Sequence, residues 1–173
     1  MRKVIYLVAA SLDGKIARRD GSFDCFLAEG DHVAGYLAAL DTFDDVLMGR
    51  GTYEVALRAG VTDPYPKMTS HVFSRTMEKS PDAHVHLVRE GAAEYVAALK
   101  QQPGRDIYLC GAAGLAAELL EAGLIDEVAV KLNPLLAGDG IPIFERVGEP
   151  RRLDLVDVKR YVSGVVLLTY RVP

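Results

Sequence analysis

The stretch Ile107-Tyr108-Leu109-Cys110-Gly111-Ala112-Ala113-Gly114-Leu115 joins two elements of different periodicity without a linker. Its first residues are apolar, β-branched or aromatic, which is typical of a buried strand. Small residues follow at once, and Leu115, Leu119 and Leu120 then lie on one face of a helix that ends at Gly123. The stretch therefore predicts a buried strand that leads directly into a helix, the connection from which α/β sheets are built.

The stretch Met48-Gly49-Arg50-Gly51-Thr52 repeats this arrangement earlier in the chain. It ends a buried strand predicted from Asp45, and Thr52 is suited to cap a helix that runs to about Arg58, with Glu54 near its positive end. A helix N-terminus presents free N–H groups, and glycine lets a phosphate approach the backbone. The two junctions predict a site for one extended dinucleotide. Ordinary α/β packing is the alternative, since neither junction has the Walker A or the Gly-x-Gly-x-x-Gly spacing.

The other segments extend this pattern into one domain over residues 1–173. Strands are predicted at residues 3–9, 45–49, 71–74, 84–88, 106–110, 127–132, 153–158 and 165–171. Helices are predicted at residues 31–40, 52–58, 92–101 and 111–123. Strands and helices alternate over the first two thirds, which implies parallel connections, whereas the helix-poor last third implies antiparallel ones. We expect an α/β fold with a mixed sheet of about eight strands and an antiparallel C-terminal edge.

Composition excludes several classes of partner. The 173 residues carry a net charge of −4, and 50% of them are hydrophobic, which fits one globular domain. The acidic balance argues against nucleic acid and anionic membranes as partners, and the apolar run at residues 4–10 is far shorter than the roughly 20 residues of a membrane span. The two cysteines lie far apart, which suggests a reducing, cytoplasmic setting. The four histidines lack metal-ligand spacing, so no metal is expected.

Two arginines favour one kind of ligand. Arg50 stands beside a helix start and the Thr52 hydroxyl, where a guanidinium can bind a phosphate monoester through two parallel hydrogen bonds. Ser74-Arg75-Thr76, after another predicted strand, repeats the combination of hydroxyl and guanidinium. A 2′-phosphate on an adenine ribose needs such groups, so NADP(H) is favoured over NAD(H). A solvated arginine and a polar strand end are the alternative interpretations.

In their order along the chain, these stretches resemble the dihydrofolate reductase superfamily. The resemblance rests on residues 9–17, Ala-Ala-Ser-Leu-Asp-Gly-Lys-Ile-Ala, and on the two strand-to-helix junctions at residues 48–54 and 107–114. Residues 133–144, Asn-Pro-Leu-Leu-Ala-Gly-Asp-Gly-Ile-Pro-Ile-Phe, are similar to one branch, the reductase domain of the bifunctional riboflavin-biosynthesis deaminase/reductase and its stand-alone bacterial relatives. The resemblance covers nearly the whole chain.

The resemblance implies a three-layer α/β/α fold that binds NADPH along the strand ends. Ala9 and Ile16 would line the nicotinamide, with residues 11–17 as a mobile loop over it. The remaining cofactor contacts implied are Gly49, Arg50, Gly51 and Thr52 at the phosphates, with Arg50 near the 2′-phosphate, Ser74 and Arg75 at the adenosine end, and Gly111, Ala112, Ala113, Gly114 and Leu115 at the pyrophosphate. It also implies a homodimer.

Four positions depart from the pattern or extend it. Dihydrofolate reductases carry a buried carboxylate on the first helix, and Asp31 is the nearest acid here, so it is the candidate catalytic residue; its alternative role is a helix N-cap. Ala112 and Ala113 stand where relatives often have glycines, and alanine still allows close approach if its φ is negative. Lys131 is a candidate contact for a phosphorylated substrate, with a solvated lysine as the alternative.

The function implied is hydride transfer from NADPH to a small heterocyclic or ribosylaminopyrimidine-type substrate. The reaction would resemble that of 5-amino-6-(5-phosphoribosylamino)uracil reductase. Dihydrofolate reductase activity is a second hypothesis, which the lack of an inward acid on the first helix disfavours. A third hypothesis is an NADP(H)-binding protein without turnover.

Overall fold

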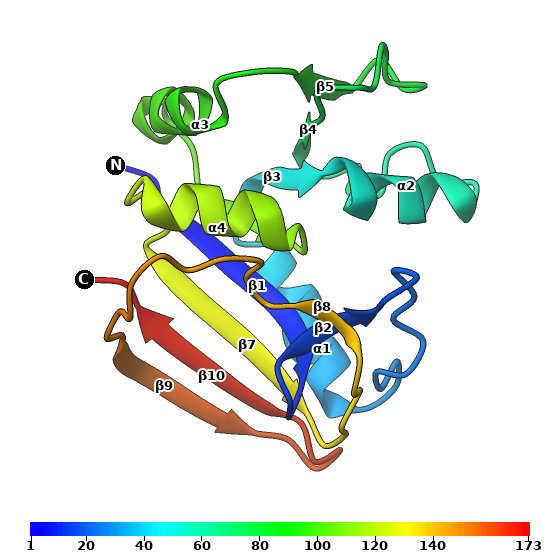
Figure 1. The fold of residues 1–173 in the computed structure, drawn as a ribbon, viewed down its shortest axis with the longest axis vertical. Helices are drawn as coiled ribbons and strands as arrows, with labels where there is room; N and C mark the ends of the chain where they lie inside the picture. The colour runs from blue at the N-terminus through cyan, green and yellow to red at the C-terminus, as the bar shows by residue number, and fades with distance from the viewer.

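The computed structural model describes residues 1–173 as one eight-stranded sheet, one two-stranded sheet and four helices (Figure 1). The strands are β1 (Val4–Ser11), β2 (Lys15–Arg18), β3 (Phe43–Gly49), β4 (Thr69–Phe73), β5 (Val85–Val88), β6 (Asp106–Cys110), β7 (Glu127–Asn133), β8 (Gly140–Pro142), β9 (Asp154–Arg160) and β10 (Val166–Arg171). The helices are α1 (Asp31–Leu40), α2 (Arg50–Arg58), α3 (Ala92–Gln101) and α4 (Ala113–Glu121).

The large sheet has the strand order β5-β4-β3-β6-β1-β7-β10-β9. Neighbours from β5 to β7 run parallel, and β10 runs antiparallel to both β7 and β9. A tight turn in which Tyr161 N–H donates to the Val165 carbonyl joins β9 to β10, and only antiparallel neighbours can be joined so briefly. The predicted mixed sheet with an antiparallel C-terminal edge is confirmed.

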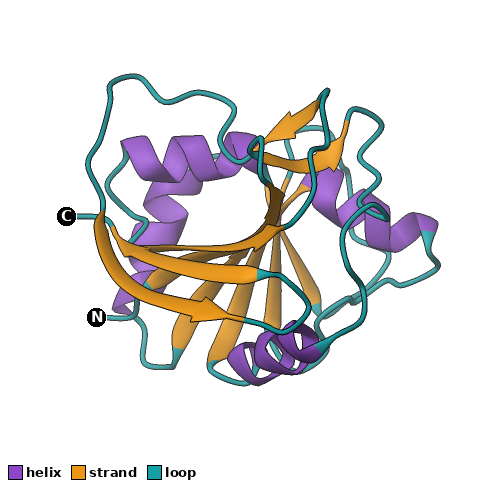
Figure 2. Cartoon of the chain, turned by 90° about the horizontal axis from the view of Figure 1, so that it is seen from below, coloured by secondary structure: helices purple, strands orange, loops and turns teal.

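Helices cover both faces of the sheet and give the predicted three layers (Figure 2). On one face, side chains of α3 and α4 such as Val96 and Leu119 pack against Tyr6 and Leu109. On the other face, Tyr53 of α2 and residues of α1 pack against the opposite sides of β3 and β6. The sheet is thus buried on both faces at its centre, which is why its central strands are apolar throughout. None of the four helices is long and apolar enough to cross a membrane.

Two predicted helix caps are wrong, although the predicted start of the first helix at residue 31 is confirmed. Thr52 is the third residue of α2, whose N-cap is Gly49, and Asp31 is the first residue of α1, whose N-cap is Gly30. Neither cap residue contributes a side-chain hydrogen bond. In both cases the chain enters the helix at a glycine, so the capping preference of threonine or aspartate does not fix the boundary.

The buried face of α1 also differs from the prediction. The apolar spacing of Val33, Tyr36, Leu37 and Leu40 predicts that these residues face the core, but Leu37 is 56% exposed, whereas His32 is buried. The His32 ring bonds the Ser163 hydroxyl through Nδ1 at 2.9 Å and the Leu27 carbonyl through Nε2 at 3.0 Å. Ser163 is distant from His32 in the sequence, and Leu27 lies in the loop before α1. The orientation of α1 is therefore set by contacts with loops, which the helical periodicity of its own residues cannot predict.

Residues 11–17 were expected to form a loop, and this is incorrect for their second half. Residues from Lys15 onward form β2, which pairs antiparallel with β8. The turn before it is held by Asp13, whose carboxylate accepts hydrogen bonds from the N–H groups of Ala137 and Gly138 at 2.9 and 2.7 Å. Asp13 and Ala137 are 124 residues apart in the sequence, so no local pattern shows this pairing.

Candidate functional site

The two strand-to-helix junctions lie side by side at the carboxyl ends of the parallel strands, because β3 and β6 are neighbours in the sheet. A Cβ built on Gly49 would lie 3.0 Å from the Cβ of Ala112, and one built on Gly111 would lie 2.9 Å from Oγ1 of Thr52. Both distances are shorter than ordinary van der Waals contact, so each glycine is required by the helix start that follows the neighbouring strand. The structure therefore brings together the two segments that the sequence suggested for one extended ligand.

Both helix N-termini at this edge retain free donors. Neither α2 nor α4 has a side-chain cap, so the N–H groups of their first turns face outward with the positive ends of the helix dipoles. Gly51 in the first turn of α2 is exposed, and a Cβ there would meet nothing within 4 Å. Next to Gly114 lies the exposed carboxylate of Glu145, 3.0 Å from where a Cβ would stand. An anion at α4 therefore requires Glu145 to turn toward solvent.

Ala112 has a left-handed backbone conformation, with φ 59° and ψ 58°. It is the only residue other than glycine with a positive φ, so the condition of a negative φ, under which alanine would allow close approach, is not met at Ala112. Gly111 is also left-handed, and the two residues together turn the chain from β6 into α4. The left-handed region costs an L-residue about 1–2 kcal/mol, a strain that glycine would avoid.

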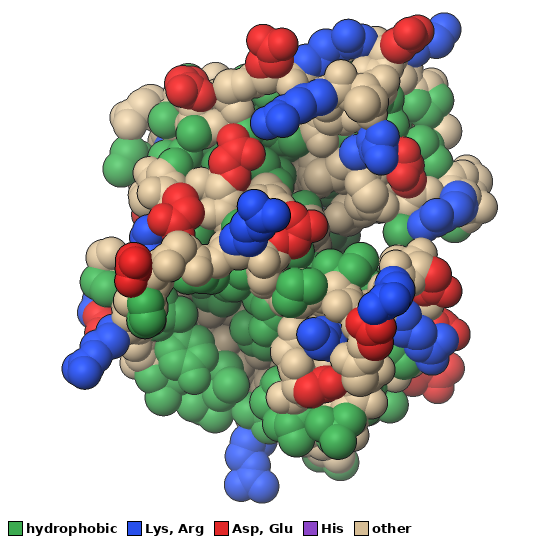
Figure 3. Space-filling view, viewed as in Figure 1, with side chains coloured by type: hydrophobic (Ala, Val, Ile, Leu, Met, Phe, Trp, Pro, Cys, Tyr) green, Lys and Arg blue, Asp and Glu red, His purple; other side chains and the backbone are tan.

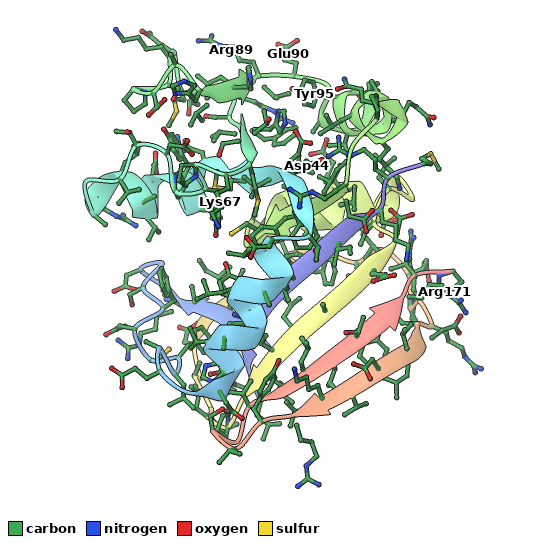
Figure 4. All side chains as sticks on the ribbon, turned by 180° about the vertical axis from the view of Figure 1, so that it is seen from behind. Asp44, Lys67, Arg89, Glu90, Tyr95 and Arg171 are labelled. Atoms are coloured by element: carbon green, nitrogen blue, oxygen red, sulfur yellow. The ribbon has the colours of Figure 1, made fainter.

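A hollow of about 610 Å³ lies beyond the ends of β4 and β5, beside the start of α4. It is lined by predicted residues from separate segments, Ser74 and Arg75 after β4 and Leu115 on α4. The other residues that line it are Phe73, Val88, Arg89, Glu90, Gly91, Ala92 and Glu118. Arg89 and Glu90 follow directly after β5 (Figure 4), and nothing in the local sequence marks them as part of a site.

The two predicted arginines lie close to this hollow but differ in their partners. Arg50 donates to Oγ1 of Thr76 at 2.6 Å, and its Nε lies 3.3 Å from a carboxylate oxygen of Glu54. Arg75 is exposed and takes part in no ion pair or side-chain hydrogen bond. Between them, buried Ser74 accepts a hydrogen bond from Met77 N–H at 3.0 Å, which shapes the turn that carries Arg75. Arg75 is thus the arginine with a free guanidinium.

Ala9 and Ile16, both predicted at the nicotinamide, approach the end of β1 from different sides. Ala9 is half-buried and pairs with Lys131 of β7, on the face covered by α1. Ile16 on β2 packs against the core cluster on the α4 side. The two residues flank the strand end, and β2 with its partner β8 forms the wall there (Figure 1).

A group of polar side chains lies on the α1 side of the sheet, near Ala9. Its members are Tyr36 of α1, Tyr65 before β4, and Tyr108 and Cys110 of β6, here called the tyrosine cluster. The Tyr36 hydroxyl is hydrogen-bonded to those of Tyr108 and Tyr65, at 3.2 and 3.4 Å, and the Tyr65 hydroxyl lies 3.1 Å from Cys110 Sγ. Alternation along β6 could have placed Tyr108 and Cys110 on one face, whereas the contribution of Tyr65 has no local signal.

Asp31 lies outside this cluster. Its exposed carboxylate accepts hydrogen bonds from Val162 N–H at 2.8 Å and Ser163 N–H at 3.2 Å, in the turn between β9 and β10. The hydrogen bond from Val162 is the largest influence that lowers the pKa of this carboxyl group. A carboxyl group with a lowered pKa is ionised near neutral pH and holds no proton to donate.

The amino-acid sequence identifies the family. A family model for the RibD C-terminal domain matches residues 2–167. The chain belongs to the RibD C-terminal domain family. This confirms the predicted relationship to the reductase domain of the riboflavin-biosynthesis deaminase/reductase.

Two curated relatives of this RibD C-terminal domain chain come from different bacteria. The uncharacterized protein YwjB of Bacillus subtilis (strain 168) is 36% identical over 169 residues, 96% of each chain. The riboflavin biosynthesis protein RibD of Corynebacterium ammoniagenes is 29% identical over 150 residues, which are 78% of this chain and 44% of that protein.

Solved structures share the RibD C-terminal domain fold. A putative riboflavin biosynthesis protein from Shewanella sp. PV-4 superposes with a TM-score of 0.84 at 24% identity, over 100% of this chain and 99% of that one. The diaminohydroxyphosphoribosylaminopyrimidine deaminase/5-amino-6-(5-phosphoribosylamino)uracil reductase of Thermotoga maritima gives a TM-score of 0.73 at 17% identity, over 99% of this chain and 57% of that one. These similarities confirm the fold class.

Proposed function

We propose that the chain is an NADPH-dependent reductase that transfers hydride to a small heterocyclic or ribosylaminopyrimidine-type substrate. The observation that carries this proposal is the meeting of two uncapped helix N-termini beside a hollow lined by Ser74 and Arg75. Free N–H groups suit a pyrophosphate, and a free guanidinium suits a phosphate monoester. A dinucleotide with a 2′-phosphate carries both groups in one molecule.

The residues present fit such a cofactor. The first turns of α2 and α4 would hold its phosphates, with open space at Gly51, and the hollow beyond β4 would take the adenosine end, with Arg75 at the 2′-phosphate. The nicotinamide would then lie toward the end of β1, at Ala9. When bound, the reduced nicotinamide supplies hydride. The chain itself has to orient the substrate beside Ala9, exclude water and provide one proton.

Membership of the RibD C-terminal domain family supports the substrate class. The Thermotoga structure is that of a protein named as a 5-amino-6-(5-phosphoribosylamino)uracil reductase, and we propose a substrate of this type for the present chain. Dihydrofolate is the weaker candidate, because the buried residue of α1 is His32 and the helix presents no inward carboxylate.

A thermal-shift comparison followed by an absorbance assay tests the proposal. NADPH should raise the melting temperature more than NADH, since a ligand at 100 times its dissociation constant stabilises a protein by roughly 2.7 kcal/mol. Loss of NADPH absorbance would then be followed with the ribosylaminopyrimidine and with dihydrofolate. No shift with either cofactor overturns the reductase assignment. A shift without turnover of either substrate would instead favour an NADP(H)-binding protein.

A further inference from the structure

Lys131 is a half-buried cation without an anionic partner. It lies on β7 opposite Ala9 of β1, and its Nζ sits 3.7 Å from the centroid of the Tyr36 ring. No carboxylate forms an ion pair with it, in contrast to Lys100, which is buried and paired with Asp126 at 2.6 Å. The face of an aromatic ring attracts a cation but accepts no ordinary hydrogen bond, so the N–H donors of Lys131 stay available to a ligand.

The groups that face Lys131 are neutral. Tyr36 of α1 lies against Lys131, and Tyr65, Tyr108 and Cys110 follow behind Tyr36 through the hydrogen bonds of the tyrosine cluster. Ala9 of β1 and Leu167 of β10, the neighbours of Lys131 across the sheet, carry no titratable group. Burial raises the pKa of each of the four groups of the tyrosine cluster. The tyrosine cluster therefore contributes no fixed negative charge near neutral pH.

Position and chemistry single out this lysine as a proton source. Figure 4 shows α1 lying over the sheet, and Lys131, which is paired with Ala9, contacts Tyr36 of this helix. A substrate reduced beside Ala9 would therefore lie within the same space. Burial lowers the pKa of Lys131, which brings it closer to neutral pH, where a general acid is most effective. Asp31 and Cys110 are weaker candidates for the proton source. The Asp31 carboxylate accepts a hydrogen bond in the turn after β9, and the Cys110 thiol lies within hydrogen-bonding distance of the Tyr65 hydroxyl.

We propose that Lys131 is the proton donor of the reduction, an inference that rests on the proposed reductase function. As the carbon of the substrate C=N or C=O bond accepts hydride from NADPH, the π electron pair moves to the nitrogen or oxygen and takes a proton from the Lys131 ammonium. NADPH is oxidised to NADP+, the substrate is reduced by two electrons, and Lys131 is left as a neutral amine. Water then returns its proton.

Three variants separate proton donation from charge and from packing. Lys131→Met keeps the length of the side chain but removes the proton, and Lys131→Arg keeps the charge with a group that does not titrate. Lys159→Met is the matched control, because Lys159 also lies over a tyrosine ring, that of Tyr161 at 5.0 Å, but on the exposed edge strand β9.

The expected result concerns kcat with the ribosylaminopyrimidine. Lys131→Met should lower kcat by about 10²–10⁴-fold, the usual contribution of a general acid, while the thermal shift with NADPH is unchanged. Lys131→Arg should keep KM close to that of the unmodified chain but lose kcat to a similar degree. In the unmodified chain kcat should fall as the pH rises through the pKa of Lys131, and Lys131→Met should lack this alkaline limb. Lys159→Met should behave as the unmodified chain.

Two outcomes overturn the assignment, and a third separates it from failure of the reductase function. If the unmodified chain turns over and Lys131→Met keeps both its kcat and its alkaline limb, Lys131 is not the donor. Competitive labelling of amines with acetic anhydride over a pH series, read by mass spectrometry, gives the titration of Lys131 directly; if Lys131 titrates no lower than Lys159, the proposal is also overturned. An unmodified chain that binds NADPH but reduces no substrate fails at the proposed function itself.

Discussion

Ala112, held in a left-handed conformation at the start of α4, has its Cβ 3.0 Å from the point that a Cβ on Gly49 would occupy at the end of β3. Gly49 itself has an ordinary φ of −76°, so its lack of a side chain is required by this contact and not by its backbone. The contact couples the two strand-to-helix junctions of the proposed cofactor site.

Gly49→Ala should therefore lower the free energy of unfolding by about 1–3 kcal/mol through overpacking. Ala112→Gly should raise it by roughly 0.5–1 kcal/mol, because relief of left-handed strain exceeds the added entropy of the unfolded chain. The double variant should be more stable than the sum of the two single effects predicts, because without the Ala112 Cβ the alanine at position 49 no longer clashes. Urea denaturation measures all three. Gly51→Ala, with nothing within 4 Å of its Cβ, is the control and should cost no stability.

Arg75 should read the 2′-phosphate more strongly than Arg50. Arg50 already bonds Thr76 and Glu54, whereas Arg75 has no partner to give up. Arg75→Ala should weaken NADPH binding by about 10–100-fold, the range for a hydrogen bond to a charged group, and leave NADH binding nearly unchanged. Arg50→Ala should narrow the NADPH to NADH preference to a smaller degree. Titration of both cofactors checks this, with Arg58→Ala as control; an equal loss of NADPH and NADH affinity would show that Arg75 does not contact the 2′-phosphate.

Asp45 should make the free energy of unfolding fall as the solution becomes acidic. It is buried between Arg2 and His71, whose Nε2 lies 2.7 Å from Oδ1 of Asp45. Burial alone would raise the pKa of Asp45, but hydrogen bonds from His71 and Arg2 and the charge of Arg2 outweigh it and lower the pKa. The stabilisation is complete above about pH 4, where an unfolded aspartate is ionised, and is lost as the pH falls through the lowered pKa.

Asp45→Asn should lower the free energy of unfolding by about 3–5 kcal/mol at pH 7, because it leaves the Arg2 charge buried without its partner. The difference between the two proteins should shrink as the pH falls below about 4. Thermal unfolding over a pH series measures both. A constant difference between pH 7 and pH 2.5 would contradict the role of Asp45 in acid unfolding.

Asp31 provides a test of the alternative catalytic acid. Because its carboxylate holds the turn of Val162 and Ser163, Asp31→Asn should keep kcat within about threefold, far from the roughly 10²–10⁴-fold loss of a missing general acid. The measurement is kcat with NADPH and the ribosylaminopyrimidine. A loss of two or more powers of ten would return Asp31 to the role of proton donor and displace Lys131.

The homodimer implied by the family resemblance should use the C-terminal edge of the sheet. Leu155, Val156 and Val158 of β9 are 57%, 57% and 47% exposed, and apolar side chains gather over the uncovered part of the sheet formed by β7, β10 and β9 (Figure 3). Burying such a surface against a second copy is favourable. Sedimentation velocity should show a dimer that Val158→Glu dissociates and Lys159→Glu, on the other face of the strand, does not. A monomeric unmodified chain would contradict this prediction.

The sequence by itself determined most elements, their order and the class of fold. α3 and β6 were predicted to the residue, because Pro103 and Gly104 end the helix and an uninterrupted apolar run marks the strand. The two strand-to-helix junctions could also be recognised, since each consists of a few consecutive residues. Periodicity and breakers are local properties, and a local pattern is enough to recognise them.

Only the tertiary structure decided what surrounds these elements. The pairing of β2 with β8, the left-handed turn at Ala112 and the contact of Lys131 with Tyr36 each join segments that are distant in sequence or depend on a neighbouring strand. The hydrogen-bond partner of a side chain and its burial depend on which residues of other segments pack against it in the folded chain. For that reason the sequence could predict a phosphate site at the two strand-to-helix junctions, while the proton donor could be proposed only once the sheet had placed Lys131 beside Ala9.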